Sequence, residues 1–506
     1  MLWRVLSASL RGIEVILVSV EVDVSSGLPN FTTVGLPDSA VRESRDRVRA
    51  AIRNAGFEFP VDRVTVSLAP ADLRKEGASF DLPIALAILG ATGCLRPPAS
   101  EPFVVIGELG LDGSIRSVRG ALAVALACRR ARIGTLLVPS VNAAEAATVD
   151  GVSALPVETL RQAAEVINGE DRLVPARPAP PPTDDHPHDI DLADVRGQAH
   201  ARRALEIAAA GDHNLLMIGP PGTGKTMLAR RLPTILPPLS LEESIEATTI
   251  WSVAGALPGG QALITSRPFR APHHTTSSPA LIGGGRYPRP GEVSLAHLGV
   301  LFLDELPEFA LHSLESLREP LEDGRVTVSR AAGSASFPAR FQLVAAANPC
   351  RRGCRSVKQC LCSPAERDRY LGRVSRPLLD RIDLHLELPA PSLDELTSQR
   401  TEETSVTVRT RIAAARRRQS GRLAGTGVAT NARMSPGHVS RFCALPAEAQ
   451  QLLARAMRRL NLSARGFHRI LKVARTIADL ESNDDIAVEH CAEAIQYRML
   501  DRRIRP

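Results

Sequence analysis

A glycine-rich segment, GPPGTGKT at Gly219–Thr226, constrains the fold of this chain more than any other feature. It follows the apolar run LLMI, which is typical of a buried strand, and it fits the pattern G-x-x-x-x-G-K-[ST]. In such a loop the glycines let backbone N–H groups cradle phosphate oxygens, and the loop leads into a helix. The segment therefore predicts a strand–loop–helix site for a nucleotide.

Each residue of this loop has an expected part. Lys225 can reach the β- and γ-phosphates, and the hydroxyl of Thr226 can ligate Mg²⁺. The residues expected to contact ATP are Gly219, Pro220, Pro221, Gly222, Thr223, Gly224, Lys225 and Thr226.

A second strand pattern, VLFLDE at Val300–Glu305, ends in two adjacent acids. Successive strand residues point to opposite faces, so the two carboxylates can take different roles. We expect Asp304 to hold Mg²⁺, usually through water, and Glu305 to orient or deprotonate the attacking water. Apolar strands that end in acids are common. The pair becomes specific only because it follows the phosphate loop by about 80 residues.

A third strand pattern, FQLVAAANP, closes on Asn348. Ligands of parallel sheets bind at the carboxyl ends of the strands, so this amide is expected to position the hydrolytic water or contact the γ-phosphate. The alternative is an asparagine that only turns the chain before Pro349.

The segment PLLDRID places Arg381 on a short polar interruption between apolar residues. A guanidinium offered to the γ-phosphate of a neighbouring subunit would accelerate phosphoryl transfer by about 10³–10⁵-fold. The alternative is an internal ion pair with Asp380 or Asp383.

The size and composition are those of a multidomain globular protein. The chain has 506 residues, 44% of them apolar and 23% charged, which suits about three domains. Its net charge of +7 gives only a mild bias toward polyanionic partners. It has no run of about 18 apolar residues, and its N-terminus alternates like strands, so we expect no membrane span, no signal peptide and a cytoplasmic location.

A proline- and aspartate-rich stretch at Asp171–Ile190 predicts an extended linker, and the alternative is a surface loop. Short β-rich runs alternate with amphipathic helices before it, and helical patterns dominate after Pro391. The predicted division is an α/β domain at 1–170, a linker at 171–191, an α/β ATPase core at 192–390 and an all-α domain at 391–506.

Four of the eight cysteines, Cys350, Cys354, Cys360 and Cys362, lie within a short loop after Asn348. This clustering argues against a disulfide framework. Four thiolates can supply a tetrahedral Zn²⁺ site, although the spacing is not that of a common zinc finger. We expect a structural zinc, and the alternative is four reduced thiols in a surface loop.

Taken together with these residues, the chain resembles an AAA+ ATPase of the magnesium-chelatase-like group. Within that group it resembles the YifB/ComM family. The segments that carry this resemblance are Gly35–Ile52, Phe269–Gly285, Pro290–Phe309 and Arg465–Leu480. The resemblance implies a hexameric ring with ATP bound between subunits. Arg381 then matches the arginine finger and Asn348 matches sensor 1.

The resemblance also assigns a lid and an insertion. Sensor 2, the lid arginine that touches the γ-phosphate, falls on Arg465, with Arg469 as the alternative. The stretch between Trp251 and Gly299 corresponds to an insertion that projects toward the central pore. His273, His274 and Gly283–Gly285 are then expected to face the pore, and the alternative for the two histidines is a structural pair.

The N-terminal region resembles the proteolytic domain of Lon proteases. The segment KEGASFD puts Ser79 at the nucleophile position, but SVRGAL puts Leu122 where the catalytic lysine would stand. A leucine cannot accept the serine proton. We therefore expect a reused fold without protease activity.

The family resemblance implies an ATP-hydrolysing, homo-hexameric motor that acts on single-stranded or branched DNA and promotes branch migration in recombination and natural transformation. The basic segments Arg409–Arg418 and Arg455–Arg459 suit phosphate contacts, or are simply solvated helix faces. The alternatives are an ATPase subunit of a metal-chelatase complex and a remodelling ATPase with another client.

Overall fold

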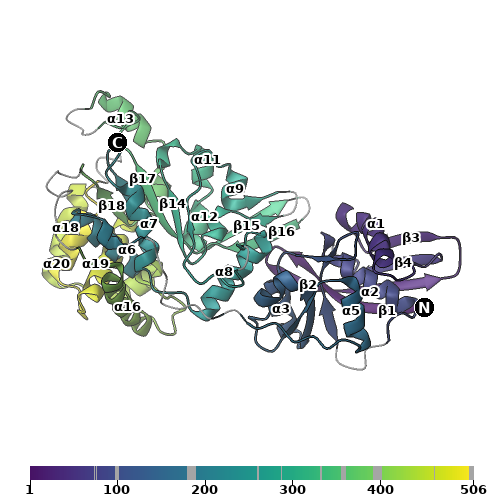
Figure 1. Cartoon of the computed structure of the whole chain (residues 1–506). Coiled ribbons are helices and arrows are strands. Elements are labelled where there is room, and N and C mark those ends of the chain that lie inside the picture. The colour runs from purple at the N-terminus through teal and green to yellow at the C-terminus, as the bar shows by residue number, and fades with distance from the viewer. Residues whose placement is uncertain are drawn as a thin grey trace.

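The computed structural model describes residues 1–72, 74–75, 77–96, 102–178, 180, 190–258, 261–285, 288–330, 333–354, 360–390, 402–460 and 462–500. An N-terminal α/β domain, a second α/β region and a set of C-terminal helices follow one another along the chain, and the helices pack against the second region (Figure 1). The expected fold class, an α/β chain with a phosphate-loop core and a C-terminal helical part, is confirmed.

The N-terminal domain is built on a seven-stranded sheet in the order β3-β4-β2-β1-β5-β8-β9. Alternation in β1 and β2 buries valines such as Val5 and Val20. Helix α2 is buried along its whole length, and its one carboxylate, Asp81, pairs with Arg47 at 2.7 Å. The strands are β1 (Leu2–Arg11), β2 (Glu14–Ser25), β3 (Asn30–Val34), β4 (Arg63–Ala69), β5 (Phe103–Val105), β8 (Thr135–Pro139) and β9 (Ser153–Val157), with a small hairpin of β6 (Glu108–Leu109) and β7 (Ile115–Arg116). The helices are α1 (Ser39–Asn54), η1 (Ala78–Phe80), α2 (Asp81–Ala91), α3 (Ala121–Arg130), α4 (Ser140–Ala146) and α5 (Leu160–Asn168).

The second region contains a five-stranded parallel sheet in the order β11-β14-β17-β10-β18. Its strands are β10 (Leu215–Ile218), β11 (Phe269–Arg270), β14 (Val300–Leu303), β17 (Gln342–Ala347) and β18 (Leu384–Glu387). Strands β10, β14 and β17 are buried throughout, as expected for a parallel sheet covered on both faces. Because neighbouring parallel strands end at the same edge, the segments after β10, β14 and β17 meet there.

Short helices and two hairpins surround this sheet. The helices are η2 (Leu192–Asp194), α6 (Ala199–Gly211), α7 (Lys225–Ile235), α8 (Leu241–Ala254), α9 (Ser278–Ile282), α10 (Glu292–Leu295), η3 (Leu306–Glu308), α11 (Leu311–Glu315), α12 (Arg318–Asp323), α13 (Pro364–Leu371) and α14 (Arg376–Leu379). The hairpins are β12–β13 (Gly283–Gly284 with Arg289–Pro290) and β15–β16 (Arg325–Arg330 with Gly333–Pro338).

The C-terminal helices are α16 (Ser405–Arg422), η4 (Asn431–Arg433), α17 (Pro436–Phe442), α18 (Ala447–Leu460), α19 (Ala464–Leu480) and α20 (Val488–Gln496). Their apolar residues share one hydrophobic cluster with the sheet region. Ile412 and Ile470, for example, belong to the same cluster as Leu215 and Leu228. The helical part therefore lies directly against the helices that flank the phosphate loop.

The strands predicted from LLMI, VLFLDE and FQLVAAANP are present as β10, β14 and β17, with ends shifted by one or two residues. The β15–β16 hairpin and β18 were not predicted. The proposed domain boundaries stay a prediction, because about half of the linker and residues 391–401 lie outside the described residues.

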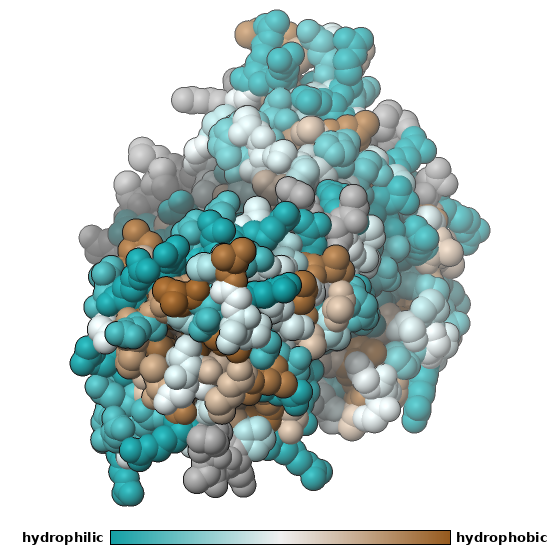
Figure 2. Space-filling view, turned by 90° about the vertical axis from the view of Figure 1, so that its right-hand side faces the viewer, coloured by the Kyte–Doolittle hydropathy of each residue, from teal (hydrophilic) through white to brown (hydrophobic). Residues whose placement is uncertain are grey.

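Figure 2 views the molecule from the side of the N-terminal domain, where brown apolar side chains form small groups separated by hydrophilic ones. Large exposed apolar residues of this domain include Leu28, Val34, Leu36 and Val61. Among the described helices, none is long and apolar enough to cross a membrane.

Candidate nucleotide-hydrolysis site

The phosphate loop joins β10 to α7, and the helix begins at Lys225. Gly222 and Gly224 have φ angles of +78° and +82°, which favour glycine and explain these residue types. The Nζ atom of Lys225 donates to the carbonyl oxygens of Gly219 at 2.6 Å and Pro220 at 2.9 Å. It also donates to Asn348 Oδ1 at 3.1 Å. The structure thus brings the loop lysine to the amide at the end of β17.

The ammonium group of Lys225 lies in a mixed environment. Burial lowers its pKa, and the nearby carboxylates of Asp304 and Glu305 offset only part of that shift. The amine nevertheless lies where a triphosphate would need a positive charge.

The acidic pair follows β14, directly beside β17 in the sheet. The hydroxyl of Thr226 donates to Asp304 Oδ2 at 2.8 Å. Two oxygen donors at this separation fit Mg²⁺, which prefers oxygen ligands and usually keeps several waters. Glu305 has a φ angle of +52°, and its N–H donates to Asp304 Oδ1 at 2.9 Å. This left-handed backbone turns the two carboxylates in different directions.

One partner of Glu305 comes from the insertion. The Nδ1 of His274 lies 3.1 Å from Glu305 Oε2, and the expectation that His274 faces a pore stays a prediction. The His274 ring also lies tilted against the ring of His273, with centroids 4.1 Å apart, and meets Phe309 edge-on. Strand β11 pairs with β14, so the loop after β11 arrives beside the end of β14. The insertion therefore contacts the predicted catalytic carboxylate directly.

Arg381 lies just after α14 and is only 6% exposed. Its Nη1 donates to the Pro377 carbonyl at 2.6 Å, and its Nη2 pairs with Glu322 of α12. The partners suggested from the sequence, Asp380 and Asp383, were wrong for this ion pair. The carboxylate of Asp383 is instead engaged by Arg469 at 2.5 Å and lies 3.5 Å from His213.

The two lid arginines have different surroundings. Arg465 is exposed near the start of α19, and its positive charge helps to lower the pKa of Glu322, after the larger effects of Arg381. Arg469, one turn further on, is committed to the buried Asp383. The geometry therefore favours Arg465 over Arg469 as the residue free to meet a γ-phosphate.

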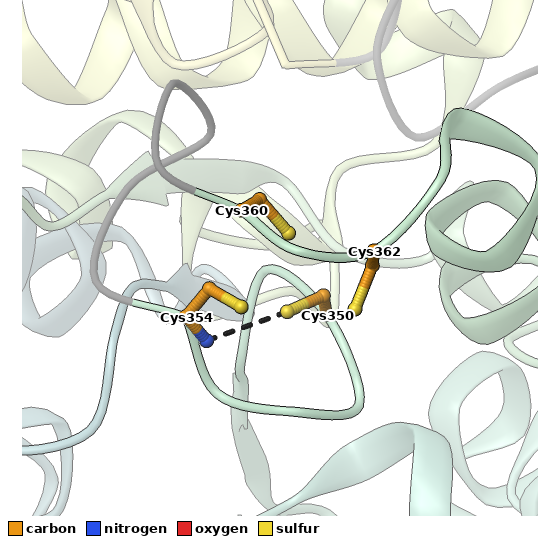
Figure 3. A group of neighbouring side chains, drawn as sticks. All are labelled: Cys350, Cys354, Cys360 and Cys362. Carbon is orange, nitrogen blue, oxygen red and sulfur yellow. Dashed lines mark hydrogen bonds between the residues drawn. The ribbon is translucent and has the colours of Figure 1, made fainter.

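The four clustered cysteines converge, as Figure 3 shows. Their sulfur atoms all lie within 4.8 Å of one another, although Cys354 and Cys360 flank residues 355–359, which are not described. The N–H of Cys354 points to the sulfur of Cys350 at 3.4 Å. A hydrogen bond from the backbone of Cys362 contributes most to lowering the pKa of Cys360 to about 7. This donor set and spacing fit a tetrahedral zinc ion.

The cysteine loop also touches the nucleotide site. A Cβ atom placed on Gly353 would lie 2.9 Å from Pro221 Cγ of the phosphate loop. Burial raises the pKa of Tyr370 to about 12, and the charges of Glu308, Glu305 and Cys350 act in the same direction. The same tyrosine thus lies near both the acidic pair and the cysteines.

Comparison with known proteins identifies the family. The model for "Magnesium chelatase, subunit ChlI" matches residues 191–396, "Subunit ChlI of Mg-chelatase" matches 20–142, and the C-terminal ChlI model matches 402–498. YifB of Salmonella typhimurium, an uncharacterized protein, is 45% identical over 96% of this chain and 94% of its own length. Competence protein ComM of Haemophilus influenzae is 44% identical over 99% and 98%. The chain belongs to the YifB/ComM family.

Membership in the YifB/ComM family makes this an AAA+ protein of the magnesium-chelatase type, the class to which ATPase activity belongs. Uncharacterized protein Rv2897c of Mycobacterium tuberculosis, 45% identical over 99% of both chains, extends the same likeness to another organism.

In the N-terminal domain of this YifB/ComM protein, Ser79 lies on η1 and lines a cavity. Leu122 is fully buried within α3 and belongs to a hydrophobic cluster. The position where the Lon resemblance requires a lysine is therefore part of an apolar core, where the amine of a lysine would be costly to bury.

Sequence reasoning missed two members of the site. Nothing along the chain indicated that Glu322 would pair with Arg381, because α12 and α14 lie far apart in sequence. The contact between His274 and Glu305 depends on the order of strands in the sheet, and the adjacent His273-His274 pair in the insertion was its only signal.

The zinc assignment leads to a specific expectation. Cys350→Ser should lower the zinc content from about one ion per chain to nearly none, because loss of one thiolate opens the tetrahedral set. The KM for ATP should rise as well, since the loop at Gly353 rests on Pro221. Elemental analysis and ATPase kinetics measure both effects. Cys94→Ser, an exposed cysteine of the N-terminal domain, is the control, and wild-type protein without zinc would refute the assignment.

Proposed function

We propose that this protein is a hexameric AAA+ motor that hydrolyses ATP between subunits and uses the energy to move or remodel DNA during the uptake and recombination of DNA. The observation that carries the hydrolytic part is the convergence of Lys225, Asn348, Thr226 and Asp304 within hydrogen-bond distance at one sheet edge. These groups come from segments about 80 and 120 residues apart, and their meeting has no evident structural purpose other than a shared ligand.

The residues have distinct proposed roles. Lys225 and the backbone N–H groups of the loop hold the β- and γ-phosphates, and Thr226 with Asp304 holds Mg²⁺, which neutralises phosphate charge. Glu305 orients the attacking water and takes its proton, and Asn348 fixes the water or the γ-phosphate. Positioning and electrostatic stabilisation supply most of the acceleration in phosphoryl transfer.

Two arginines that lie outside the phosphate loop support a hexamer. Arg381 and Arg465 both lie near Glu322. Among the described residues, neither arginine makes a hydrogen bond or ion pair with the phosphate loop or the acidic pair. We infer that they complete the ATP site of a neighbouring copy, where Arg381 exchanges Glu322 for the γ-phosphate.

DNA as the client is supported by the name of one relative, competence protein ComM, and by the charge of α18. Arg455, Arg458 and Arg459 are exposed there, and none pairs with a carboxylate of a described residue. The Arg409–Arg418 segment is less suited to DNA than the sequence indicated. Three of its arginines are engaged within the chain: Arg411 with Glu206 and Glu403, Arg416 with the Ala209 carbonyl, and Arg418 with Asp484.

The decisive experiment measures ATPase activity of the full-length protein with and without single-stranded, duplex and forked DNA. Stimulation by any of the three supports a DNA motor. Lys225→Ala should abolish ATP binding and serves as the inactive control. ATP hydrolysis that is indifferent to all three DNAs would instead favour a chelatase-type or other remodelling ATPase, the second candidate suggested by the matching ChlI models.

His274 gives a separate test of the assigned water-orienting group. Because its Nδ1 fixes one oxygen of Glu305, His274→Ala should lower kcat by up to about 10²-fold, the effect of a misplaced catalytic group, with little change in KM for ATP. His273→Ala is the matched control, because its Nδ1 bonds Thr275 instead. An unchanged or raised kcat would show that His274 does not position Glu305 for catalysis.

A further inference from the structure

The N-terminal domain meets the core at two places. Helix α3 approaches α8, and the β15–β16 hairpin approaches the turn between β1 and β2 (Figure 1). At the first, the N–H of Gly120 donates to the Ser252 carbonyl at 3.2 Å. At the second, Gly12 abuts Ala335, so that a Cβ on this glycine would lie 2.8 Å from the Ala335 side chain. A cavity of about 1200 Å³ lies between these two contacts and is lined by both parts of the chain.

Four arginines line this cavity, Arg74 and three that come from separate elements. Arg11 ends β1, Arg119 precedes α3, and Arg289 begins β13 of the insertion. The side chains of these last three make no hydrogen bond or ion pair with the described part of the chain. Arg119 reaches across the domain boundary onto Gly255, where a Cβ would lie 2.8 Å from its Nε. Burial and the positive charge of Arg289 lower the pKa of Arg119, so the two like charges lie close together.

The acids of the same cavity are largely engaged elsewhere. Asp38 caps α1 by accepting the N–H of Val41 at 2.8 Å, and it also accepts the N–H of Gly77. Glu108 pairs with Arg116 at 3.9 Å. The negative charge of Asp72 opposes the lowering of the Lys75 pKa by burial, and the Lys75 ammonium donates to the Pro70 carbonyl.

The fourth acid, Glu145, is 4% exposed. Its Oε1 accepts from Asn142 at 2.7 Å, and the hydroxyl of Ser252 lies near enough to the carboxyl to act on its pKa. Burial raises its pKa, while hydrogen bonds from Asn142 and Ser252 oppose that shift.

We propose that this cavity binds the phosphodiester backbone of single-stranded DNA through Arg11, Arg119 and Arg289. Guanidinium groups suit phosphate oxygens, and hydroxyl groups add further donors. The lining serines are Ser9, Ser39, Ser79, Ser117, Ser252 and Ser334. Among the described residues, no aromatic side chain lines the cavity, which favours contacts to the backbone over base stacking.

The cavity volume is about 1200 Å³. It exceeds the usual range of about 300–1,000 Å³ for small-molecule sites and suits a few nucleotides of one strand. The inference rests on the proposed action on DNA and gives the N-terminal domain a role in place of proteolysis.

The test is the salt dependence of binding of fluorescein-labelled oligo(dT) to the full-length protein, followed by fluorescence anisotropy. Each phosphate contact contributes about 0.7 to the slope of log K against log [salt] for single strands. The Arg119→Ala/Arg289→Ala variant should therefore show a slope smaller by about 1.4. Its affinity at 0.1 M salt should fall roughly 25-fold, which is about five-fold for each contact.

Arg129→Ala is the matched control, because Arg129 is exposed on α3 but does not line the cavity. Its slope should equal that of the wild type, and thermal melting checks that every variant is folded. An unchanged slope in the double variant, or an equal loss in the control, overturns the cavity site while leaving DNA action intact. Wild-type protein that binds no oligo(dT) overturns both the site and the proposed client.

Discussion

Replacing Glu305 by glutamine should stop steady-state hydrolysis and leave ATP bound. Glutamine keeps the size and polarity of the side chain but cannot accept a proton from water. Loss of a general base costs about 10²–10⁴-fold in kcat. The Thr226–Asp304 pair and Lys225 are untouched, so the affinity for ATP should stay near that of the wild type. Single-turnover hydrolysis together with nucleotide binding measures the two properties separately.

The matched control for this change is Glu308→Gln. Glu308 lies three residues away on η3 and pairs with Arg373 at 3.1 Å, outside the contacts of the phosphate loop. Its variant should hydrolyse ATP at nearly the wild-type rate. If the Glu305→Gln protein also hydrolysed ATP normally, the assignment of Glu305 would be wrong. If the Glu305→Gln protein failed to bind ATP, Glu305 would be needed to maintain the structure of the nucleotide site.

Replacing Arg381 by alanine should reduce kcat by about 10³-fold or more, the effect expected when an arginine finger is removed. The single chain offers a competing explanation, because Arg381 is buried against Glu322 and Pro377. A stability defect would then lower activity without any role across the subunit interface. Thermal melting and ATPase kinetics of Arg381→Ala and Glu322→Gln separate these explanations. Glu322→Gln should retain most activity if the arginine acts on a neighbouring γ-phosphate.

Mixed rings provide the sharper measurement. Arg381→Ala subunits keep Glu305, and Glu305→Gln subunits keep Arg381. Mixing two inactive proteins therefore recreates intact interfaces wherever an Arg381→Ala subunit receives the arginine of a Glu305→Gln neighbour. Recovery of ATPase activity on mixing shows that Arg381 acts between subunits. Absence of recovery, with a melting temperature lowered as in Glu322→Gln, assigns Arg381 to the internal ion pair.

Much of the core could be predicted because its signals are local. The β10–loop–α7 unit is encoded in one contiguous stretch, and the acids after β14 stand at the end of an apolar run. The β15–β16 hairpin was missed because its alternation is short and its inner face carries small residues such as Ala335. Strand β18 was missed because polar residues interrupt LHLE, and His385 is nevertheless buried.

The placement of individual side chains was less predictable. Arg465 and Arg469 stand one turn apart on α19 and look equivalent in sequence, yet only Arg469 meets the buried Asp383. The direction of His274 likewise could not be read from the insertion. Each outcome depends on which element packs against the residue. The local sequence around the residue does not indicate that element.

The sequence alone determined the chemistry of the phosphate loop, the likeness to the YifB/ComM family and the substitution of Leu122 for a catalytic lysine. These features depend on residues that are neighbours in the chain, so their spacing suffices. Tertiary structure decided which distant groups meet. Lys225 reaches Asn348, Glu305 meets His274, and Arg381 pairs with Glu322. The physical reason is that the order of parallel strands and the packing of helices on them bring together the ends of segments that no local pattern connects.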